Sequence, residues 1–252
     1  MSQPGDWSYT WEARGGPFTI LLAPGVFAPT RTSIEVAEGL TIHPGETVID
    51  VGSGSGVLSF VAARLGAARV YGTEINPVAV EVARRNAAIL GLGESVDFRE
   101  GSLFEPLAGI RANVVIGDVS GIPDDIAAAS DWFPGGFSGG PTGAEVPVAM
   151  LEGSRSHLAP GGRLYLPTGS IQDEIAVLRA ARRIFGDRIR KLRERMLPLP
   201  GKITDSAMVR RLMDSGVVQF IRKGSRWLWE LRIWECTLPG PETEALTRNV
   251  LM

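Results

Sequence analysis

The chain has 252 residues, a formal net charge of −2 and one cysteine. This length fits one α/β domain with additions and is sufficient to bury a substantial core. The charge provides no overall basic field to attract nucleic acid, and the single Cys236 excludes an internal disulfide and a multi-cysteine zinc site. The N-terminal residues lack the pattern of a signal peptide, and no stretch approaches the roughly 18 apolar residues of a membrane helix. We therefore expect a cytoplasmic protein with no membrane partner and no metal site.

The chain begins with a segment rich in aromatic residues, glycine and proline. Residues 1–30 therefore predict an N-terminal arm, as a short hairpin or an extended segment, ahead of one domain over 31–252. Trp7 and Trp11 in this arm could line a substrate mouth or brace the arm, and both alternatives stay open at this point.

Helical and strand patterns alternate after the arm. Thr32 and Glu35 form a capping box that predicts a helix over 32–42, and Asn76 with Pro77 predicts the start of another helix. The other predicted helices are 57–65, 144–158, a helix capped by Ser170 and Asp173 that ends near Phe185, and 203–214. The predicted strands are 47–51, 69–73, 95–99, 112–117, 163–167, 188–197, 217–222 and 226–236. This order indicates an α/β fold with a Rossmann-like, seven-stranded, mainly parallel sheet, an antiparallel C-terminal strand and helices on both faces. An insertion is expected over about 199–222.

The most informative segment is 48–56, which reads Val-Ile-Asp-Val-Gly-Ser-Gly-Ser-Gly, followed by Glu74 at the end of the next apolar run. A β-branched strand that enters a turn of alternating glycines lets the backbone approach a ligand closely. An acidic side chain at the end of the next strand can accept hydrogen bonds from both hydroxyls of a ribose. No lysine lies near the turn, which excludes a nucleotide-hydrolase phosphate loop, and Val57 replaces the third glycine of a dinucleotide fingerprint. A nucleoside-containing cofactor is therefore expected.

The glycines Gly52, Gly54 and Gly56, with Asp50 before them and Glu74 after them, resemble motif I of class I S-adenosylmethionine (SAM) methyltransferases. The resemblance is closest to the group that contains the release factor glutamine methyltransferases and the ribosomal protein L11 methyltransferases. It implies SAM as the cofactor. By this resemblance the glycines admit SAM, Asp50 orders the loop or holds the SAM amino group, and Glu74 holds the ribose.

The resemblance covers roughly residues 25–168 and implies further SAM contacts. The segment 26–33 looks like the part of the family that lies over the methionine moiety of SAM. After the third strand, Ser102 replaces an aspartate that usually meets the adenine, and its hydroxyl is a neutral, weaker acceptor. The implied SAM-binding residues are Asp50, Gly52, Ser53, Gly54, Gly56, Glu74, Ile75, Ser102, Leu103 and Ser33.

The chain departs from this group after the fourth strand. The glutamine methyltransferases carry Asn-Pro-Pro-Tyr there, whereas residues 118–121 read Asp-Val-Ser-Gly. Asp118 can accept a hydrogen bond from an amine and orient its lone pair, but an ionised Asp118 cannot donate to a glutamine carbonyl. Gly121 removes the aromatic platform. The sequence therefore argues against glutamine methylation and makes Asp118 the candidate catalytic residue.

The acceptor atom is constrained by the scarcity of basic catalytic groups. His43 and His157 both precede strand-entry turns and are expected to lie far from the SAM loops. A phenol or alcohol acceptor usually needs a positioned base, so nitrogen, or an acidic carbon, is favoured over oxygen. The basic residues in 179–195 are interpreted as a solvated face rather than an RNA footprint, so a nucleic-acid partner is not expected.

A glycine-rich segment follows the candidate catalytic strand and forms a substrate loop predicted over about 118–143. Trp132, Phe133 and Phe137 in this loop are candidates for covering an apolar or aromatic substrate. The alternative is a surface loop with one aromatic side chain anchored in the core.

Together these patterns favour a SAM-dependent methyltransferase that acts on a nitrogen atom of a small molecule or peptide. Two alternatives stay open. One is an N-methyltransferase of a protein or ribosome component whose acceptor loop has diverged, and the other is a non-catalytic module that binds SAM. A homodimer is compatible with the sequence but not required by it.

Overall fold

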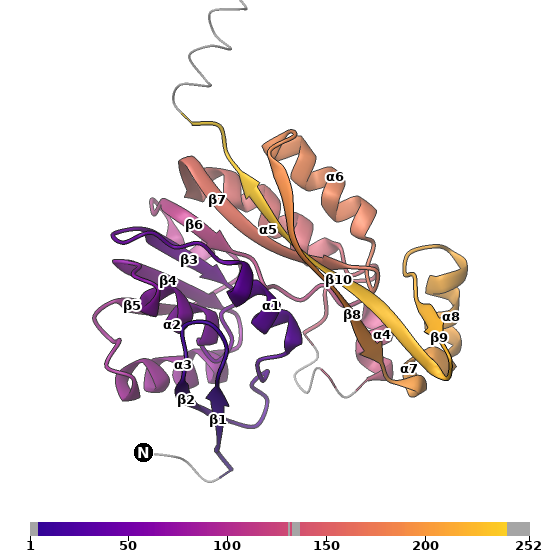
Figure 1. The fold of residues 1–252 in the computed structure, drawn as a ribbon. Coiled ribbons are helices and arrows are strands. Elements are labelled where there is room, and N and C mark those ends of the chain that lie inside the picture. Colours follow the sequence, from indigo (N-terminus) through magenta and orange to yellow (C-terminus); the bar gives the residue numbers. More distant parts are fainter. Residues whose placement is uncertain (1–4, 131, 133–136, 241–252) are drawn as a thin grey trace, which may run out of the picture.

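The computed structural model describes residues 5–130, 132 and 137–240, and its centre is one large β-sheet (Figure 1). In this described part, the sheet holds eight strands in the order β5-β4-β3-β6-β7-β10-β8, with β9 paired to β10. These strands are β3 (Thr47–Val51), β4 (Arg69–Glu74), β5 (Val96–Glu100), β6 (Ala112–Ile116), β7 (Leu158–Gly169), β8 (Ile189–Leu199), β9 (Ile221–Lys223) and β10 (Arg226–Thr237). The neighbouring strands β5, β4, β3, β6 and β7 pair in parallel. Strand β10 is antiparallel to both β7 and β8.

This sheet confirms the predicted Rossmann-like architecture with an antiparallel C-terminal strand. The eighth strand is β9, so the expected number of seven is exceeded by one short element. Strand β9 replaces the strand predicted over 217–222 and is shorter, because only Ile221, Arg222 and Lys223 pair with β10. The turn between β9 and β10 consists of Gly224 and Ser225.

Helices cover both faces of the sheet (Figure 1). They are α1 (Arg31–Gly39), α2 (Val57–Arg64), α3 (Pro77–Ile89), η1 (Glu105–Leu107), α4 (Asp124–Ala129), α5 (Glu145–His157), α6 (Glu174–Phe185), α7 (Gly201–Asp205) and α8 (Ala207–Asp214). Side chains alternate along β3: Val48 belongs to the core cluster under α1, α2 and α3, whereas Ile49 belongs to the cluster under α5 and α6. Among the described residues, the helices are too short or too polar to cross a membrane.

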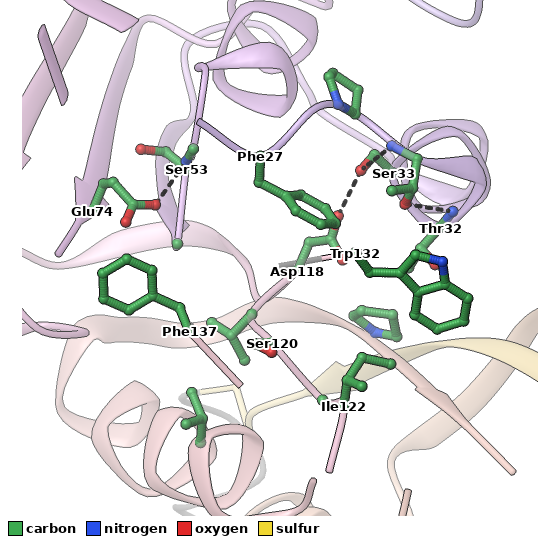
Figure 2. Close-up of a pocket in the computed structure, with 18 of the residues that line it drawn as sticks. Phe27, Thr32, Ser33, Ser53, Glu74, Asp118, Ser120, Ile122, Trp132 and Phe137 are labelled. Carbon is green, nitrogen blue, oxygen red and sulfur yellow. Dashed lines mark hydrogen bonds between the residues drawn. The ribbon is translucent and has the colours of Figure 1, made fainter. Parts of the chain in front are cut away.

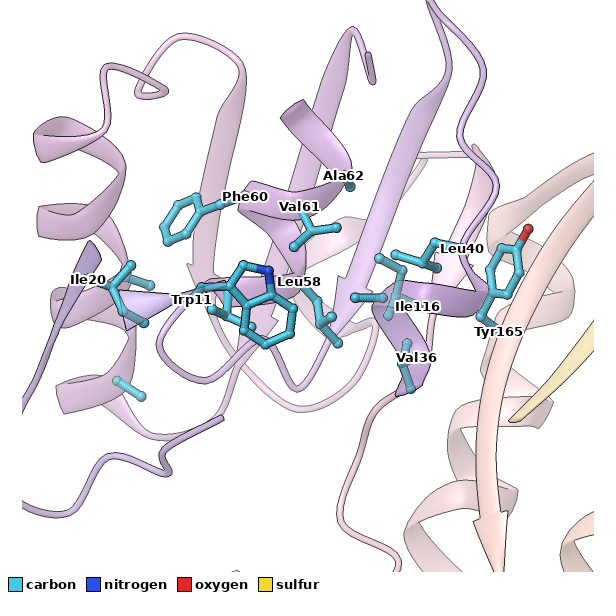
Figure 3. Close-up of a cluster of buried hydrophobic side chains, with 14 of the residues drawn as sticks. Trp11, Ile20, Val36, Leu40, Leu58, Phe60, Val61, Ala62, Ile116 and Tyr165 are labelled. Carbon is cyan, nitrogen blue, oxygen red and sulfur yellow. The ribbon is translucent and has the colours of Figure 1, made fainter. Parts of the chain in front are cut away.

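The N-terminal arm forms the predicted hairpin from β1 (Trp7–Trp11) and β2 (Phe18–Leu22), which pair antiparallel. Trp11 is fully buried and stacks on Phe18 with ring centroids 6.3 Å apart. Phe18 in turn meets Phe60 of α2 edge-on at 6.1 Å. Figure 3 shows Trp11 among side chains of the first core cluster. Trp11 therefore braces the arm, and the hairpin shares its core with the sheet.

Helix α1 begins one residue earlier than predicted and ends at Gly39 rather than near residue 42. Its cap is Thr30, whose hydroxyl accepts a hydrogen bond from the Thr32 N–H at 3.2 Å, so the predicted capping box of Thr32 and Glu35 is wrong. Glu35 is 1% exposed and pairs with Arg193 and Arg195 of β8 at 2.7 and 3.1 Å. The Glu35 carboxylate therefore binds arginines of β8 and not the backbone N–H that it would accept from in a capping box.

Three further elements differ from expectation. The segment 117–143 contains helix α4, which its glycines and prolines concealed. The predicted helix 203–214 is divided into α7 and α8 at Ser206. Ser170 does not cap α6, because its hydroxyl accepts a hydrogen bond from the Glu230 N–H at 2.9 Å; Asp173 is the cap, as predicted.

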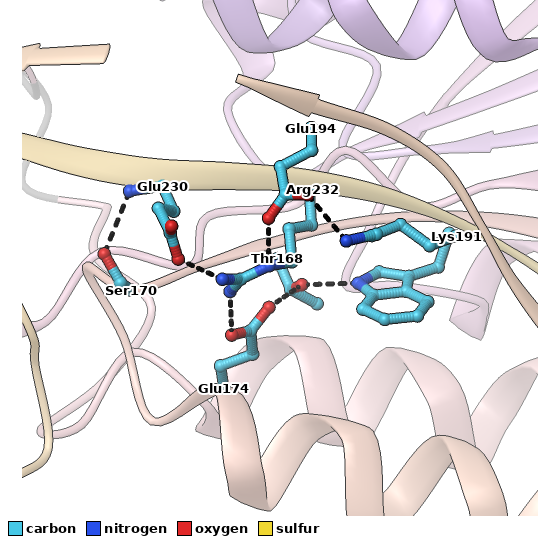
Figure 4. A network of polar contacts seen from close by, with 8 residues as sticks. Thr168, Ser170, Glu174, Lys191, Glu194, Glu230 and Arg232 are labelled. Carbon is cyan, nitrogen blue, oxygen red and sulfur yellow. Dashed lines mark hydrogen bonds and ion pairs between the residues drawn. The ribbon is translucent and has the colours of Figure 1, made fainter. Parts of the chain in front are cut away.

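The outer face of β10 carries a polar network centred on Arg232 (Figure 4). The guanidinium of Arg232 contacts Glu174 of α6 at 2.5 Å, Glu194 of β8 at 3.1 Å and also Glu230 on its own strand. Arg232 and Glu174 are 19% and 17% exposed, so their pairing is largely shielded from water. The network ties α6 to two strands of the sheet.

Replacing Arg232 with leucine is expected to lower the free energy of unfolding by about 2 kcal/mol, because three carboxylates would lose a partly buried cation. Urea denaturation measures this change. Arg226→Leu is the matched control, since Arg226 is exposed on the same strand. An equal loss of unfolding free energy in both variants would contradict a stabilising role of the Arg232 network.

Candidate functional site

A cleft of about 1350 Å³ opens at the carboxyl ends of β3, β4, β6 and β7 (Figure 2). The strand order reverses at β3, whose neighbours are β4 and β6. In open parallel sheets, ligands bind at such a switch point, outside the carboxyl ends of the strands. The cleft exceeds the range of about 300–1,000 Å³ of typical small-molecule pockets, so it has room for more than one ligand.

The alternating glycines form the turn between β3 and α2. Gly54 has φ +54°, and a Cβ there would meet no atom within 4 Å, so the backbone lies open to the cleft. Gly56 has φ +93° and does not line the cleft. A Cβ on Gly56 would lie 2.6 Å from Phe60 and 2.8 Å from Phe98, so this glycine allows the turn to pack on two aromatic rings.

Glu74 ends β4 and connects two loops at the cleft. Its carboxylate accepts hydrogen bonds from the Gly54 N–H at 3.0 Å and from the Asn76 N–H at 2.9 Å. A carboxylate has about four acceptor positions, so two remain for a ligand. Asn76 caps α3 as predicted, and Ile75 is 53% exposed and lines the cleft.

Asp50 lies at the floor of the cleft and is 1% exposed. The Ser59 hydroxyl of α2 donates a hydrogen bond to it at 2.6 Å. Burial, with the nearby charges of Asp118 and Glu74, raises the pKa of Asp50 to about 7. Three carboxylates from adjacent strand ends therefore face one cleft, which favours a ligand with positive charge.

Asp118 follows β6 and is bound to helix α1. The Ser33 hydroxyl, which is 7% exposed, donates a hydrogen bond to the Asp118 carboxylate at 3.0 Å (Figure 2). Loss of hydration raises the pKa of Asp118 to about 6, although the bond from Ser33 opposes this shift. Asp118 therefore stays ionised at neutral pH and can accept a hydrogen bond or a proton.

The segment after β5 also reaches the cleft. Ser102 and Leu103 both line it and are partly exposed. The Ser102 N–H donates to Glu105 at 3.2 Å, and Leu103 has φ +48°, a left-handed conformation that is uncommon outside glycine.

The aromatic residues of the predicted substrate loop are placed differently from one another. Trp132 is partly buried, packs against the first core cluster and also lines the cleft. Phe137 lines the cleft and is 46% exposed, whereas Phe133 lies outside the described residues. Trp7 of β1 lines the mouth of the cleft and is 46% exposed.

Four polar groups that line the cleft have buried atoms without a hydrogen-bond partner within the described structure. They are the Ser53, Thr73 and Ser120 hydroxyls and the Gln172 side-chain N–H₂. Thr73, Ser120 and Gln172 were not predicted as site residues. Each of the three lies at or just after the carboxyl end of a parallel strand, where ligands bind in open sheets, and this position could have identified them. Neither histidine lines the cleft, and His157 instead stacks on Phe104 with centroids 4.6 Å apart.

Comparisons with known proteins identify methyltransferases that are similar to this chain. The family model described as ribosomal protein L11 methyltransferase (PrmA) matches residues 23–133. The release factor glutamine methyltransferase of Moorella thermoacetica is 32% identical over 166 residues, which are 61% of this chain and 58% of the relative. The ribosomal protein L11 methyltransferase of Pelotomaculum thermopropionicum is 38% identical over 152 residues, or 57% of this chain and 47% of the relative.

Among solved structures, the 16S rRNA N2 G1207 methyltransferase of T. thermophilus, in complex with AdoMet and guanosine, superposes with a TM-score of 0.61 at 16% identity. The match covers 94% of this chain and 51% of that one, and it shows a shared fold. This chain spans about half the length of the curated relatives it matches. The matches confirm the resemblance seen in the motifs: by sequence and fold, this chain is related to the class I methyltransferases of the group that includes the release factor glutamine and ribosomal protein L11 methyltransferases.

Proposed function

We propose that this protein transfers a methyl group from SAM to a nitrogen atom of a small molecule or peptide with an apolar or aromatic body. The observation that carries the proposal is the convergence of Asp50, Glu74 and Asp118 on a cleft whose glycine turn is open at Gly54. SAM carries a sulfonium and an ammonium group against one carboxylate, so its net positive charge suits a cleft whose described lining has more acidic residues than its one cation, Arg31.

The described residues of the cleft supply the polar groups that an adenosyl ligand needs. Glu74 retains free acceptor positions for the two ribose hydroxyls. Ser102 and Leu103 line the part of the cleft beyond β5, where the adenine would be held by a hydroxyl and a backbone N–H. Asp50 and the unpaired Ser53 hydroxyl lie where the amino acid portion would bind. Ser33 serves Asp118 through its hydrogen bond.

The chemistry supplied by bound SAM is an activated methyl group on a positively charged sulfur. Asp118 accepts an N–H hydrogen bond from the acceptor and directs the nitrogen lone pair at the methyl carbon. An N–C bond forms, the S–C bond breaks, and its electron pair stays on sulfur. Asp118 or solvent then takes the proton that the nitrogen loses. The chain's contribution is mainly alignment and exclusion of water.

Nitrogen is the acceptor that these groups favour. Among the residues that line the cleft, none is histidine or lysine. An alcohol or phenol, whose proton is held much more tightly than that of carboxylic acid, would have only a carboxylate with a pKa of about 6 as its base. A neutral amine needs no strong base, so Asp118 is sufficient.

A protein acceptor is the second candidate. The names of the two curated relatives designate a release factor and ribosomal protein L11 as their targets. Exposed aromatic residues at the cleft mouth support a macromolecular acceptor here, because Trp7, Phe27 and Phe137 are 46%, 40% and 46% exposed. The cytoplasmic location and a homodimer stay predictions.

The proposed function is tested in two steps. Calorimetry measures SAM binding to the purified chain, and incubation with SAM labelled in the methyl group and cell extract measures transfer. Label in the small-molecule fraction supports the first candidate, whereas label in a protein band supports the second. Binding without any transfer would contradict both and would identify a non-catalytic SAM-binding module.

The rate of methyl transfer is expected to depend on pH through Asp118. Its raised pKa of about 6 means that the carboxylate is protonated below that pH and no longer accepts the acceptor N–H. The rate at saturating SAM, divided by the fraction of the acceptor amine that is neutral at each pH, should therefore fall about tenfold per pH unit below 6. Ser33→Ala removes a hydrogen bond that lowers this pKa, so the midpoint of the profile should move upward. A profile that is the same in Ser33→Ala and in the parent chain would contradict this account.

A further inference from the structure

The loop between β7 and α6 places an amide group in the cleft that the reaction described above does not use. Gln172 is 5% exposed, and its side-chain N–H₂ has no hydrogen-bond partner within the described structure. A buried donor without a partner is costly and uncommon in folded proteins. Gln172 lines the cleft, so a bound ligand can supply the missing acceptor.

The position of this amide depends on Gly121. A Cβ on Gly121 would collide with the side-chain oxygen of Gln172, so the amide occupies the space beside this glycine. Gly121 lies three residues after Asp118, in the loop that follows β6. The Ser120 hydroxyl between them is also buried without a partner. Two adjacent strand ends therefore present unsatisfied polar groups near the candidate catalytic carboxylate.

The cleft that Gln172 and Ser120 line also has many apolar side chains. They include Ile122, Trp132, Ile171, Trp229 and Leu231. Such a lining suits an apolar or aromatic body with a small number of polar atoms.

The charge of the site also matters. Among the described residues, the cleft is lined by the acidic residues Asp50, Glu74, Asp118 and Glu145 and by one cation, Arg31, which already pairs with Glu35 at 3.0 Å. This balance disfavours a ligand carboxylate and favours a neutral oxygen acceptor.

We propose that the Gln172 amide and the Ser120 hydroxyl donate hydrogen bonds to a carbonyl oxygen of the acceptor substrate. The acceptor is then an amine that carries a neutral carbonyl group on an apolar or aromatic body. Asp118 holds the nitrogen, and Gln172 holds the oxygen. The inference rests on the proposed methyl transfer and adds the residue that selects the acceptor. A site built to hydrogen-bond one substrate atom discriminates strongly against an analogue that lacks it.

Two probes isolate the carbonyl contact. L-Phenylalaninamide and phenethylamine share an aromatic ring and an amine, and only the first carries a carbonyl oxygen. Labelled methyl transfer to each probe is measured for the parent chain, Gln172→Leu and Ser120→Ala. The kcat/KM for the amide is divided by the kcat/KM for the amine in each variant, and these ratios are compared between variants. The intrinsic reactivities of the two probes are the same in every variant, so they cancel in this comparison.

The parent chain is expected to prefer the amide, and Gln172→Leu should reduce this preference about tenfold, mainly through KM. Ser120→Ala gives a smaller reduction and keeps the test valid if the first variant folds poorly. Gln219→Leu is the matched control, since Gln219 is exposed outside the cleft and its loss should leave the preference unchanged.

The inference is overturned if the parent chain methylates neither probe, or if Gln172→Leu lowers transfer to both probes by the same factor. SAM affinity, measured by calorimetry in each variant, should not change. Failure of the parent chain to bind SAM would instead remove the proposed function itself. The two failures are therefore distinguishable.

Discussion

Asp118→Ala is expected to lower turnover about a thousandfold while SAM affinity changes less than threefold. In the proposed function, the Asp118 carboxylate contacts the reacting nitrogen, whereas the ribose and adenine would be held by Glu74 of β4 and by Ser102 and Leu103, which follow β5. Loss of Asp118 removes both the group that orients the lone pair and the group that accepts the proton. Single-turnover kinetics with labelled SAM measure the chemical step, and calorimetry measures the affinity.

Two further variants sharpen this test. Asp118→Asn keeps the shape of the side chain and one oxygen acceptor, so it should retain more activity than alanine but lose the dependence on pH near 6. Asp125→Ala is the matched control, because Asp125 belongs to α4 and does not line the cleft. Equal losses of turnover and SAM affinity in Asp118→Ala would remove its proposed role.

The local motifs were predictable because each one depends on a few consecutive residues. The apolar run before Gly52 defines β3, and Asn76 with Pro77 defines the start of α3. Both signals act through backbone conformation and capping, which the sequence encodes directly. Helix α1 was misplaced because Glu35 has a tertiary partner in Arg193, which lies far away in the sequence.

The candidate site was predictable where it lies on the resemblance and in the glycine-rich loop, since Trp132 and Phe137 of that loop also line the cleft. Asp50, Glu74 and Asp118 were identified by spacing, and the structure brings all three to one cleft. Gln172 was missed because its contact with Gly121 depends on the adjacency of β6 and β7. From the sequence alone, Gly121 indicates only the loss of an aromatic platform. The structure shows that this glycine also makes room for the Gln172 amide.

Asp118 and Gln172 have complementary hydrogen-bonding roles in the proposed acceptor site. Ionised Asp118 cannot donate a hydrogen bond to a carbonyl oxygen, which is why the sequence argues against glutamine as the acceptor. Gln172 supplies donors from a different strand end, so the acceptor and donor functions are divided between two side chains. Selectivity therefore depends on the distance between the ends of β6 and β7, which the parallel pairing of Ile116 with Tyr165 fixes.

Glu74→Ala is expected to weaken SAM binding by at least about a hundredfold. Charged hydrogen bonds to the two ribose hydroxyls would be lost, and each contributes about 1.5–3 kcal/mol. The variant also frees the N–H groups of Gly54 and Asn76, which loosens the turn that faces the ligand. Calorimetric titration with SAM measures the affinity. Glu81→Ala is the matched control, since Glu81 is exposed on α3 and does not line the cleft.

The demethylated product, S-adenosylhomocysteine, separates the two ways in which Glu74 can act. The product shares the ribose with SAM but lacks the sulfonium charge. A contact with the ribose hydroxyls predicts that Glu74→Ala weakens both ligands by the same factor. General attraction of a carboxylate for a cation predicts a larger loss for SAM, and this difference should shrink at high salt. Unchanged affinity for both ligands would contradict the ribose assignment and with it the proposed orientation of SAM in the cleft.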